Sequence, residues 1–413
     1  MASPALALRQ TRLPVVPVIQ ATSAILVDGD TGQVLYAHNA DDRLPMASTT
    51  KIMTAMLFCE RVPPEQLITV SKYAASVGES SLHLKTGERL TAHDLLYAMI
   101  LRSANDGCVA AAEATSGSEA AFVQLMNKRA RALGLTNTHY ANCHGLTAPG
   151  HFTSARDLAT LARVALTDPR LAAVFRTRLI DIQRSIDVKD EAIRTHDHFL
   201  ADYPGADGVK TGWTVPAGHC FVGSAVRDGL HLISVVLHSP NYLNETTELM
   251  NYGFGAFTPK IAERAGTMVG RCHVSGGTVS HVSVETLADL HYDVLRGTTP
   301  RVRVQSSIHA LQAPVAMHGI AGEDTVLLDG QPVCSTPLVV ERPVPHAAAR
   351  QNTAAFGGFW ICSILLLLLL VSLRNAPVKR RTRTSSQASR ARRSGVTTGQ
   401  RTADRQRAGS GKR

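Results

Sequence analysis

The sequence predicts an α/β (α+β) domain with a helical subdomain, followed by a small all-β domain and a C-terminal transmembrane helix. Three observations lead to this prediction. Residues 22–255 have strand-like runs at both ends and helical patterns between them. Residues 256–345 consist of short Val-, Thr- and Gly-rich runs. Residues 354–373 form an apolar stretch that carries no charge and is long enough to span a bilayer as a helix.

Segment 22–255 is predicted to build one sheet from both of its ends. Residues 22–37 read as two strands around an Asp- and Gly-rich turn, and 218–238 read as a second hairpin. The region 48–173 is mainly helical. Its best example is 91–101, where Thr91 is suited to cap a helix with one apolar face. A last helix is expected at 244–252.

Segment 256–345 changes texture, because Gly, Pro and Asp punctuate its short apolar runs. This is typical of a small β-rich domain. Residues 346–353 resemble a linker. Residues 1–21 contain Arg9 and Arg12 before a short apolar stretch interrupted by prolines, which indicates a degenerate or truncated signal segment.

The C-terminal part of the chain is predicted to anchor it in a membrane. Residues 374–413 contain 13 Lys or Arg and one acid, a net charge of +12. Because the whole chain has a net charge of +10, the remaining residues together have a net charge of −2. Positive residues favour the cytoplasmic side, so we expect a single-pass protein of the bacterial cell membrane whose residues before 354 lie outside. The tail 374–413 should be disordered and cytoplasmic. The nearly neutral body gives no reason to expect nucleic-acid binding.

The cysteines do not suggest a metal framework. Seven are scattered without a Cys-x-x-Cys pair. Buried free thiols are expected, and one disulfide remains open.

The most specific chemical signal is Ser48 followed three residues later by Lys51. Side chains three apart on a helix share a face, so a neutral Lys51 can take the serine proton. Burial near another positive charge lowers a lysine pKa and makes such a base available. Pro45 stops the helix from extending upstream. Ser48 should therefore lie near a helix N-terminus, where free backbone N–H groups can bind an oxyanion.

Two further motifs follow in order along the chain. Ser103–Asn105 comes after the predicted helix 91–101, and Lys210–Gly212 comes at the start of strand-like sequence. Each motif has a copy elsewhere. The second Lys-Thr-Gly, Lys85–Gly87, precedes Ser103 and is followed by charged residues, which predicts a surface turn. The ordered triplet Ser-x-x-Lys, Ser-x-Asn and Lys-Thr-Gly is typical of penicillin-binding proteins and class A β-lactamases.

These residues make chemical sense together. Ser48 attacks a carbonyl to form an acyl-enzyme, with Lys51 as general base. Ser103 can pass a proton to the leaving amine, and Asn105 can orient Lys51 or bind the substrate amide.

The third motif adds a substrate-binding strand. Lys210 and Thr211 can bind a free carboxylate, and Gly212 lets a substrate backbone approach the strand edge. A cation placed for a carboxylate indicates cleavage next to a C-terminus.

With these motifs the chain resembles the low-molecular-mass penicillin-binding proteins, the serine-type D-alanyl-D-alanine carboxypeptidases, which have a β-lactamase/transpeptidase-like fold. The resemblance covers about 22–345. It implies that Lys210–Gly212 is the functional copy, that the backbone N–H groups of Ser48 and Trp213 form the oxyanion hole, and that His144 lies beside the site. Four more stretches match the pattern of this family: Ala24–Tyr36, Asn142–Leu161, Asp207–Ala225 and Leu311–Gly330.

The resemblance also implies a function. Such an enzyme removes the terminal D-alanine from peptidoglycan stem pentapeptides through the Ser48 acyl-enzyme, in cell-wall maturation and shape. Its partners would be the stem peptide ending in D-Ala-D-Ala, β-lactam antibiotics as inhibitors, and the membrane. No metal or organic cofactor is expected.

Two features depart from the pattern of the family. Family members often carry an Arg just before the helix that closes the catalytic domain, whereas here the stretch is Ser239–Asn244. Either carboxylate binding then depends more on Lys210 and Thr211, or the preferred substrate differs. The segment before Lys-Thr-Gly reads Thr195–His198; its His-x-His is interpreted as a loop rather than a metal site.

Three other functions remain open. A β-lactamase would use the same triplet, but no Glu-x-x-x-Asn pattern lies between Ser103 and Lys210. A peptidoglycan endopeptidase would share the catalytic domain, and an inactive wall-binding scaffold would need none of the intact catalytic residues.

Overall fold

The computed structural model describes residues 15–347. A five-stranded antiparallel sheet forms the base of the α/β part, and its strands come from both ends of the segment, as predicted. Their order is β2 (Val34–His38), β1 (Ser23–Asp28), β9 (Leu230–Ser239), β8 (Gly218–Arg227) and β7 (Ala206–Thr214). Because β1 pairs with β9, the N-terminal hairpin is joined to the later strands, and β7 is left at the edge.

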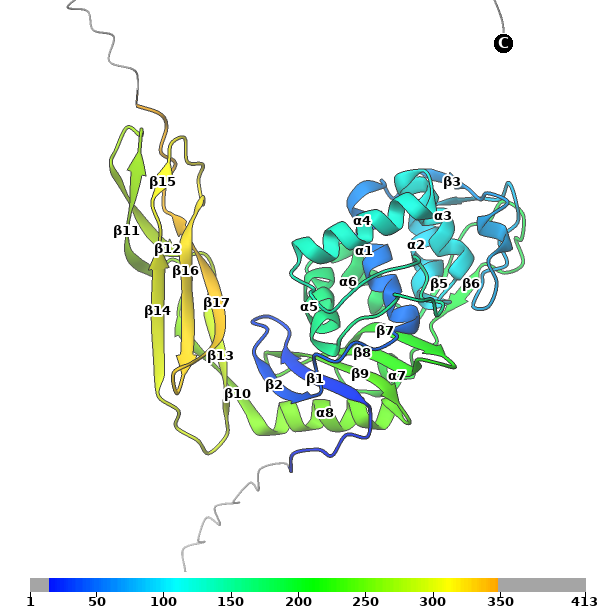
Figure 1. Cartoon of the computed structure of the whole chain (residues 1–413), viewed down its shortest axis with the longest axis horizontal. Helices are drawn as coiled ribbons and strands as arrows, with labels where there is room; N and C mark the ends of the chain where they lie inside the picture. Colours follow the sequence, from blue (N-terminus) through cyan, green and yellow to red (C-terminus); the bar gives the residue numbers. More distant parts are fainter. Residues whose placement is uncertain (1–14, 348–413) are drawn as a thin grey trace, which may run out of the picture. The chain divides into compact units, whose positions relative to one another are not determined.

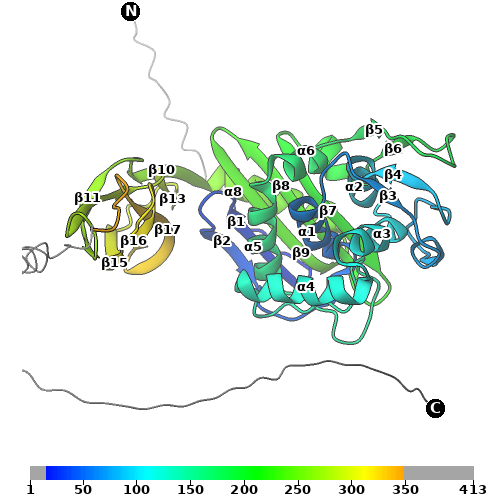
Figure 2. The ribbon, with the colours of Figure 1, turned by 90° about the horizontal axis from the view of Figure 1, so that it is seen from above.

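Helices cover both faces of this sheet (Figure 1). Helix α8 (Tyr242–Ala256) packs on one face against β8 and β9. The other face carries the helical layer, in which α5 crosses β1, β8 and β9 (Figure 2). The helices of this layer are α1 (Lys51–Arg61), α2 (Ala92–Leu101), α3 (Asn105–Ser116), α4 (Glu119–Ala132), α5 (Ala155–Leu166) and α6 (Pro169–Phe175).

Side chains that alternate between the two faces of the sheet contribute to two hydrophobic cores, one on each face. On β1, Ile25 and Val27 pack with the helical layer, whereas Ala24 and Leu26 pack with α8. Successive strand residues point to opposite faces, so a strand covered on both sides is apolar throughout.

The helix starts follow local sequence signals. Thr91 accepts a hydrogen bond from the Asp94 N–H at the start of α2, which confirms the predicted helix. Two short antiparallel pairs were not predicted, one within the mainly helical region 48–173 and one after it. They are β3 (Leu67–Thr69) with β4 (Arg89–Thr91) and β5 (Leu179–Asp181) with β6 (Ala192–Arg194).

Between residues 257 and 347 all regular elements are strands, as the sequence of this segment predicts. Six strands form one sheet in the order β14-β16-β17-β12-β11-β15, and β10 pairs with β13. Their bounds are β10 (Phe257–Glu263), β11 (Met268–Ser275), β12 (His281–Thr286), β13 (Leu290–Leu295), β14 (Val302–Ile308), β15 (Leu311–Gln312), β16 (Ile320–Leu328) and β17 (Gln331–Val340). The boundaries 22–255 and 256–345 stay predictions.

Several predictions fall outside the described residues. The transmembrane helix 354–373 and the tail 374–413 lie entirely there, as do most of the linker 346–353 and of the signal segment 1–21. Within residues 15–347, no helix combines the length and apolar character needed to cross a membrane. The six cysteines in this part of the chain are buried free thiols, as expected.

Candidate active site

Ser48 and Lys51 lie where the helical layer meets the sheet. Residues Ala47–Thr50 form a 3-10 turn that leads directly into α1, so Ser48 stands one turn ahead of Lys51 on the same face. The Lys51 Nζ is 2.9 Å from the Ser48 Oγ. Ala47 has a φ of +47°, a left-handed conformation that is uncommon for a residue with a side chain and that clusters at functional sites.

Lys51 is fully buried and has three polar neighbours. Besides Ser48, its Nζ lies 2.7 Å from the Asn105 Oδ1 and 2.6 Å from the His144 backbone oxygen. The Asn105 Nδ2 donates to the Gly78 oxygen, which fixes the orientation of that amide. Two of the three neighbours are therefore pure acceptors.

This arrangement determines the direction of the Lys51 lone pair. A neutral amine has two N–H groups, and the two carbonyl oxygens require both of them. Its lone pair must then face the Ser48 hydroxyl, which donates to it. Burial lowers the pKa of Lys51, while the nearby Cys108 and Cys143 thiols and Asp106 act in the opposite direction. Geometry and burial thus both favour Lys51 as the base.

Ser103 and Asn105 come together with Lys51 through the turn between α2 and α3. Ser103 is buried and has a φ of +57°, and Asn105 is the first residue of α3. The hydrogen bonds found among residues 15–347 include none from the Ser103 hydroxyl to Ser48 or Lys51. Its role in proton transfer stays a prediction.

The Lys210–Gly212 motif lies within the edge strand β7, not at the start of a strand as predicted. The sequence signal was misleading because Pro204 to Asp207 resembles a turn, whereas β7 already begins at Ala206. Here β7 runs against the 3-10 turn: a Cβ built on Gly212 would lie 2.8 Å from the Ser48 backbone nitrogen. Trp213, the next residue, is exposed. The second copy, Lys85–Gly87, is an exposed turn, as predicted.

Lys210 is the second buried lysine of the site. Burial, followed by the charge of Lys51, lowers the pKa of Lys210 to about 7, while Asp197 acts in the opposite direction. Burial raises the pKa of Asp197 to about 6. Lys210 and Asp197, together with Thr211 and His196, line one small pocket.

The Thr195–His198 segment therefore lies next to Lys210. Residues 195–197 form a loop, as predicted, but His198 begins the short helix α7 (His198–Asp202), which Asp197 caps. No group of three or more His, Cys, Asp or Glu side chains within residues 15–347 is arranged to hold a metal ion.

His144 lies beside the site and contacts it through its backbone. Its carbonyl accepts from Lys51, while its ring faces protein on both sides: Nδ1 accepts from the Leu146 N–H, and Nε2 is 3.5 Å from Glu119. Burial and then Lys51 lower the pKa of His144 to about 4. The ring is neutral with its proton on Nε2. Sequence reasoning did not select Glu119, because an acid after a Ser cap is ordinary at a helix start.

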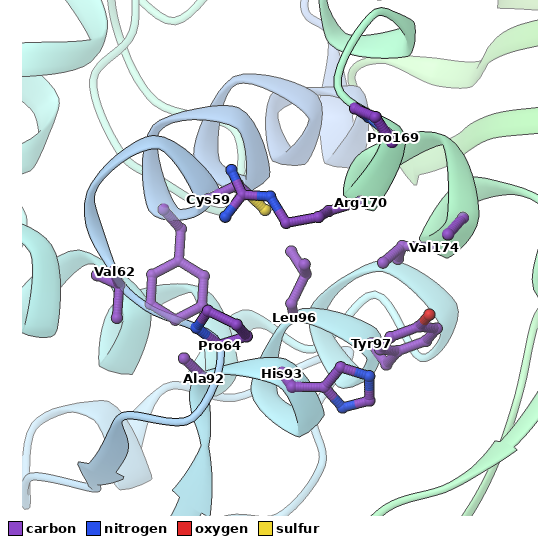
Figure 3. Close-up of a pocket in the computed structure, with 12 residues that line it drawn as sticks. Cys59, Val62, Pro64, Ala92, His93, Leu96, Tyr97, Pro169, Arg170 and Val174 are labelled. Atoms are coloured by element: carbon purple, nitrogen blue, oxygen red, sulfur yellow. The ribbon is translucent and has the colours of Figure 1, made fainter.

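The apolar pocket in Figure 3 is a separate feature. It has a volume of about 380 Å³ and is lined by the C-terminal half of α1 with parts of α2 and α6. Phe58 and Cys59 belong to it, two helical turns beyond Lys51. Since Ser48, Ser103 and Lys210 are absent from its lining, this pocket is not the catalytic site.

The fold, together with a serine beside a buried lysine and an edge strand that runs against both, defines the class of serine-type peptidases. A family model for D-alanyl-D-alanine carboxypeptidase, peptidase family S11, matches residues 10–241, which is more than half of the chain. The chain belongs to this family.

Relatives with the same name extend the match beyond residue 241. D-alanyl-D-alanine carboxypeptidase DacF of Bacillus subtilis is 31% identical over 341 residues, covering 79% of this chain and 87% of the relative. DacA of Escherichia coli K12 is 31% identical over 354 residues, covering 82% and 87%.

Solved structures agree on the fold. Penicillin-binding protein 5 of Haemophilus influenzae aligns with a TM-score of 0.65 at 28% identity, over 80% of this chain and 99% of that one. The DD-transpeptidase of Streptomyces K15 aligns with a TM-score of 0.55 at 30% identity, over 58% of this chain and 99% of that one. The alignment with the Streptomyces protein covers a smaller share of this chain than the alignment with the Haemophilus protein.

Proposed function

We propose that this chain removes the terminal D-alanine from peptidoglycan stem peptides through an acyl-enzyme on Ser48. The observation that carries the proposal is the placement of Lys51, whose two N–H groups are held by carbonyl oxygens so that its lone pair faces Ser48. The names of the relatives support the substrate class.

The reaction follows from this geometry. The Ser48 Oγ attacks the carbonyl of the penultimate D-alanine as Lys51 takes the hydroxyl proton. The backbone N–H groups of Ser48 and Trp213 would stabilise the oxyanion. The C–N bond then breaks, and the leaving amine receives a proton from Lys51, with Ser103 as carrier. In the second step of the reaction, water hydrolyses the Ser48 ester, and a proton from that water restores the Ser48 hydroxyl.

The β7 strand supplies the substrate contacts in this proposal. The peptide backbone pairs with the open edge at Gly212, and the terminal carboxylate binds Lys210 and Thr211. Penicillins carry a carboxylate beside a strained amide, so they should acylate Ser48 as substrate mimics. The stretch Ser239–Asn244 contributes no cation, which makes Lys210 more important here.

The acceptor that releases the acyl group is a separate question. The Streptomyces K15 protein is described as a DD-transpeptidase, in which an amine replaces water. An endopeptidase would cleave a cross-link instead. Because the relatives DacF and DacA are named carboxypeptidases, we expect hydrolysis of the terminal alanine to dominate. Transpeptidation and cross-link cleavage are the measurable alternatives.

The first experiment compares three substrates. The full chain is incubated with a pentapeptide ending in D-Ala-D-Ala, with a cross-linked dimer, and with the pentapeptide plus a free amino acid, and the product masses are followed. Loss of one alanine, absent in Ser48→Ala, supports the proposal. Cleavage of the dimer alone, or exchange of alanine for the added amino acid without hydrolysis, would replace it with an endopeptidase or a transpeptidase. No turnover by folded protein would indicate a scaffold.

The alkaline pH dependence should report Lys210. Its cationic form binds the carboxylate and its pKa is about 7, so kcat/KM should fall as the pH rises through 7. A bound carboxylate favours the charged lysine, so the fall in kcat should lie at higher pH. In Lys210→Arg the side chain stays cationic, so the alkaline fall in kcat/KM should shift to higher pH. An unchanged alkaline fall in this variant would assign it to another group.

We also propose that residues 354–373 anchor the chain in the bacterial cell membrane as one transmembrane helix. Their lack of charge and the basic residues from Arg374 onward support this orientation, with the tail in the cytoplasm. The linker 346–353 would connect the anchor to the extracytoplasmic part. We expect the full chain to remain with the membranes after cell fractionation. A version that ends at residue 352 should appear in the soluble fraction.

A further inference from the structure

Glu119, the first residue of α4, gathers an unusual number of donors outside the catalytic motifs. Its Oε1 accepts from the Cys143 N–H at 3.2 Å and from the Cys143 thiol at 3.3 Å, and it lies 3.5 Å from the His144 Nε2. Its Oε2 accepts from the Tyr73 hydroxyl at 2.7 Å. Burial alone would raise the pKa of Glu119, but the hydrogen bonds from Tyr73 and Cys143 hold it below its usual range. The group is therefore an ionised, mostly buried carboxylate.

Of these neighbours, Cys143 and His144 belong to the loop 142–146, which supplies one of the two acceptors for Lys51. The loop 142–146 is held on its other side by α1, because the Thr54 hydroxyl donates to the Cys143 oxygen. Within the loop, the Asn142 side chain accepts from the backbone N–H groups of His144 and Gly145. On a further side, Glu119 accepts from the Cys143 N–H and lies beside the His144 ring.

The same carboxylate also contacts the segment that orients the second acceptor. Tyr73 precedes Gly78, whose oxygen accepts from Asn105 and so fixes the Asn105 amide. Glu119 thus contacts two segments. The loop 142–146 reaches Lys51 directly through the His144 carbonyl, and the segment 73–78 reaches it through Asn105.

We propose that Glu119 is a positioning residue for the general base: it holds the His144 carbonyl in place, so that both N–H groups of a neutral Lys51 are occupied and its lone pair faces Ser48. This inference rests on the proposed acyl-enzyme function and goes beyond it by adding a residue outside the three motifs. If the His144 carbonyl turned away, the amine would be free to rotate, and the productive direction of the lone pair would be one of several.

The test measures the acylation of Ser48 in the full chain by a fluorescent penicillin, over a range of penicillin concentrations, for four proteins. Glu119→Ala removes the carboxylate, and Glu119→Gln keeps an oxygen that can accept from the Cys143 N–H. Glu113→Ala is the matched control, because Glu113 also accepts a hydrogen bond in the helical layer, from Ser71, but does not contact the loop 142–146. Thermal unfolding reports the folded fraction of each protein.

We expect Glu119→Ala to lower the limiting acylation rate about tenfold to a hundredfold, since small misplacements of a catalytic group have effects of this size. The penicillin concentration at half-maximal rate should stay close to that of the unmodified chain. Glu119→Gln should recover most of the rate, and Glu113→Ala should lose little of it.

Three results would overturn the proposal: an unchanged limiting rate in Glu119→Ala, a loss no larger than the unfolded fraction, or an equal loss in Glu119→Gln and Glu119→Ala. The assay does not need carboxypeptidase turnover. If the unmodified chain is acylated but releases no D-alanine, the proposed function fails while the role of Glu119 is still decided. If the unmodified chain is not acylated, both fail.

Discussion

Replacing Lys51 with Arg should lower the rate of Ser48 acylation about a thousandfold, within the range that general-base catalysis contributes. The guanidinium keeps the positive charge but has no lone pair to accept a proton at any pH near neutrality. The substitution thus separates the function of Lys51 as a base from its function as a charge. Burst labelling with a fluorescent penicillin measures the rate directly.

The control for this variant is Lys210→Arg at pH 6, where both lysine and arginine are cationic at that position. Lys210→Arg should still be acylated, because in our proposal Lys210 binds the carboxylate and takes no proton from Ser48. If Lys51→Arg were acylated as fast as the unmodified chain, Lys51 would not be the base, and the proton of Ser48 would have to move elsewhere.

Replacing Gly212 with Ala should reduce kcat/KM about a hundredfold, as expected when an oxyanion-stabilising donor is displaced. The added Cβ would lie 2.8 Å from the Ser48 nitrogen and 3.1 Å from the Thr49 nitrogen. Both neighbours are backbone atoms of the 3-10 turn before α1, so β7 must move away from this turn. The expected loss appears in turnover of the pentapeptide and in penicillin acylation alike.

The second Lys-Thr-Gly copy offers a matched control for that variant. A Cβ on Gly87 would meet nothing within 4 Å, although its φ of +83° makes any side chain unfavourable there. Gly87→Ala should therefore lose some thermal stability but keep its activity. Equal losses of activity in the two variants would show that the Gly212 effect is general destabilisation rather than a local displacement.

Much of the site was predictable because its key spacings are local. Ser48 and Lys51 are one helical turn apart, and a Ser-x-x-Lys run after Pro45 indicates that turn without tertiary information. The cap at Thr91 likewise indicates where α2 begins, and α2 leads directly to Ser103. The strand-like runs at both ends of segment 22–255, with helical patterns between them, indicated one sheet built from both ends.

The remaining features depend on contacts between distant residues. Nothing in the local sequence shows that the His144 carbonyl, rather than its ring, contacts Lys51, because that depends on how the loop 142–146 folds against α1. Glu119 is distant in sequence from every motif and is indistinguishable there from an ordinary helix-capping acid. The proximity of Asp197 to Lys210 likewise follows from the packing of the loop before α7 beside β7.

The open edge of β7 has a consequence for which peptides the enzyme accepts. Within residues 15–347 this strand has a neighbour on one side only, so one row of its N–H and C=O groups is left for a bound chain. Such pairing recognises groups that every amino acid has, and it depends on the direction of the chain rather than on its side chains. Selection should therefore be strict at the free carboxyl terminus and tolerant further along the stem. An enzyme of this design can process walls whose peptides differ in their cross-linking residues.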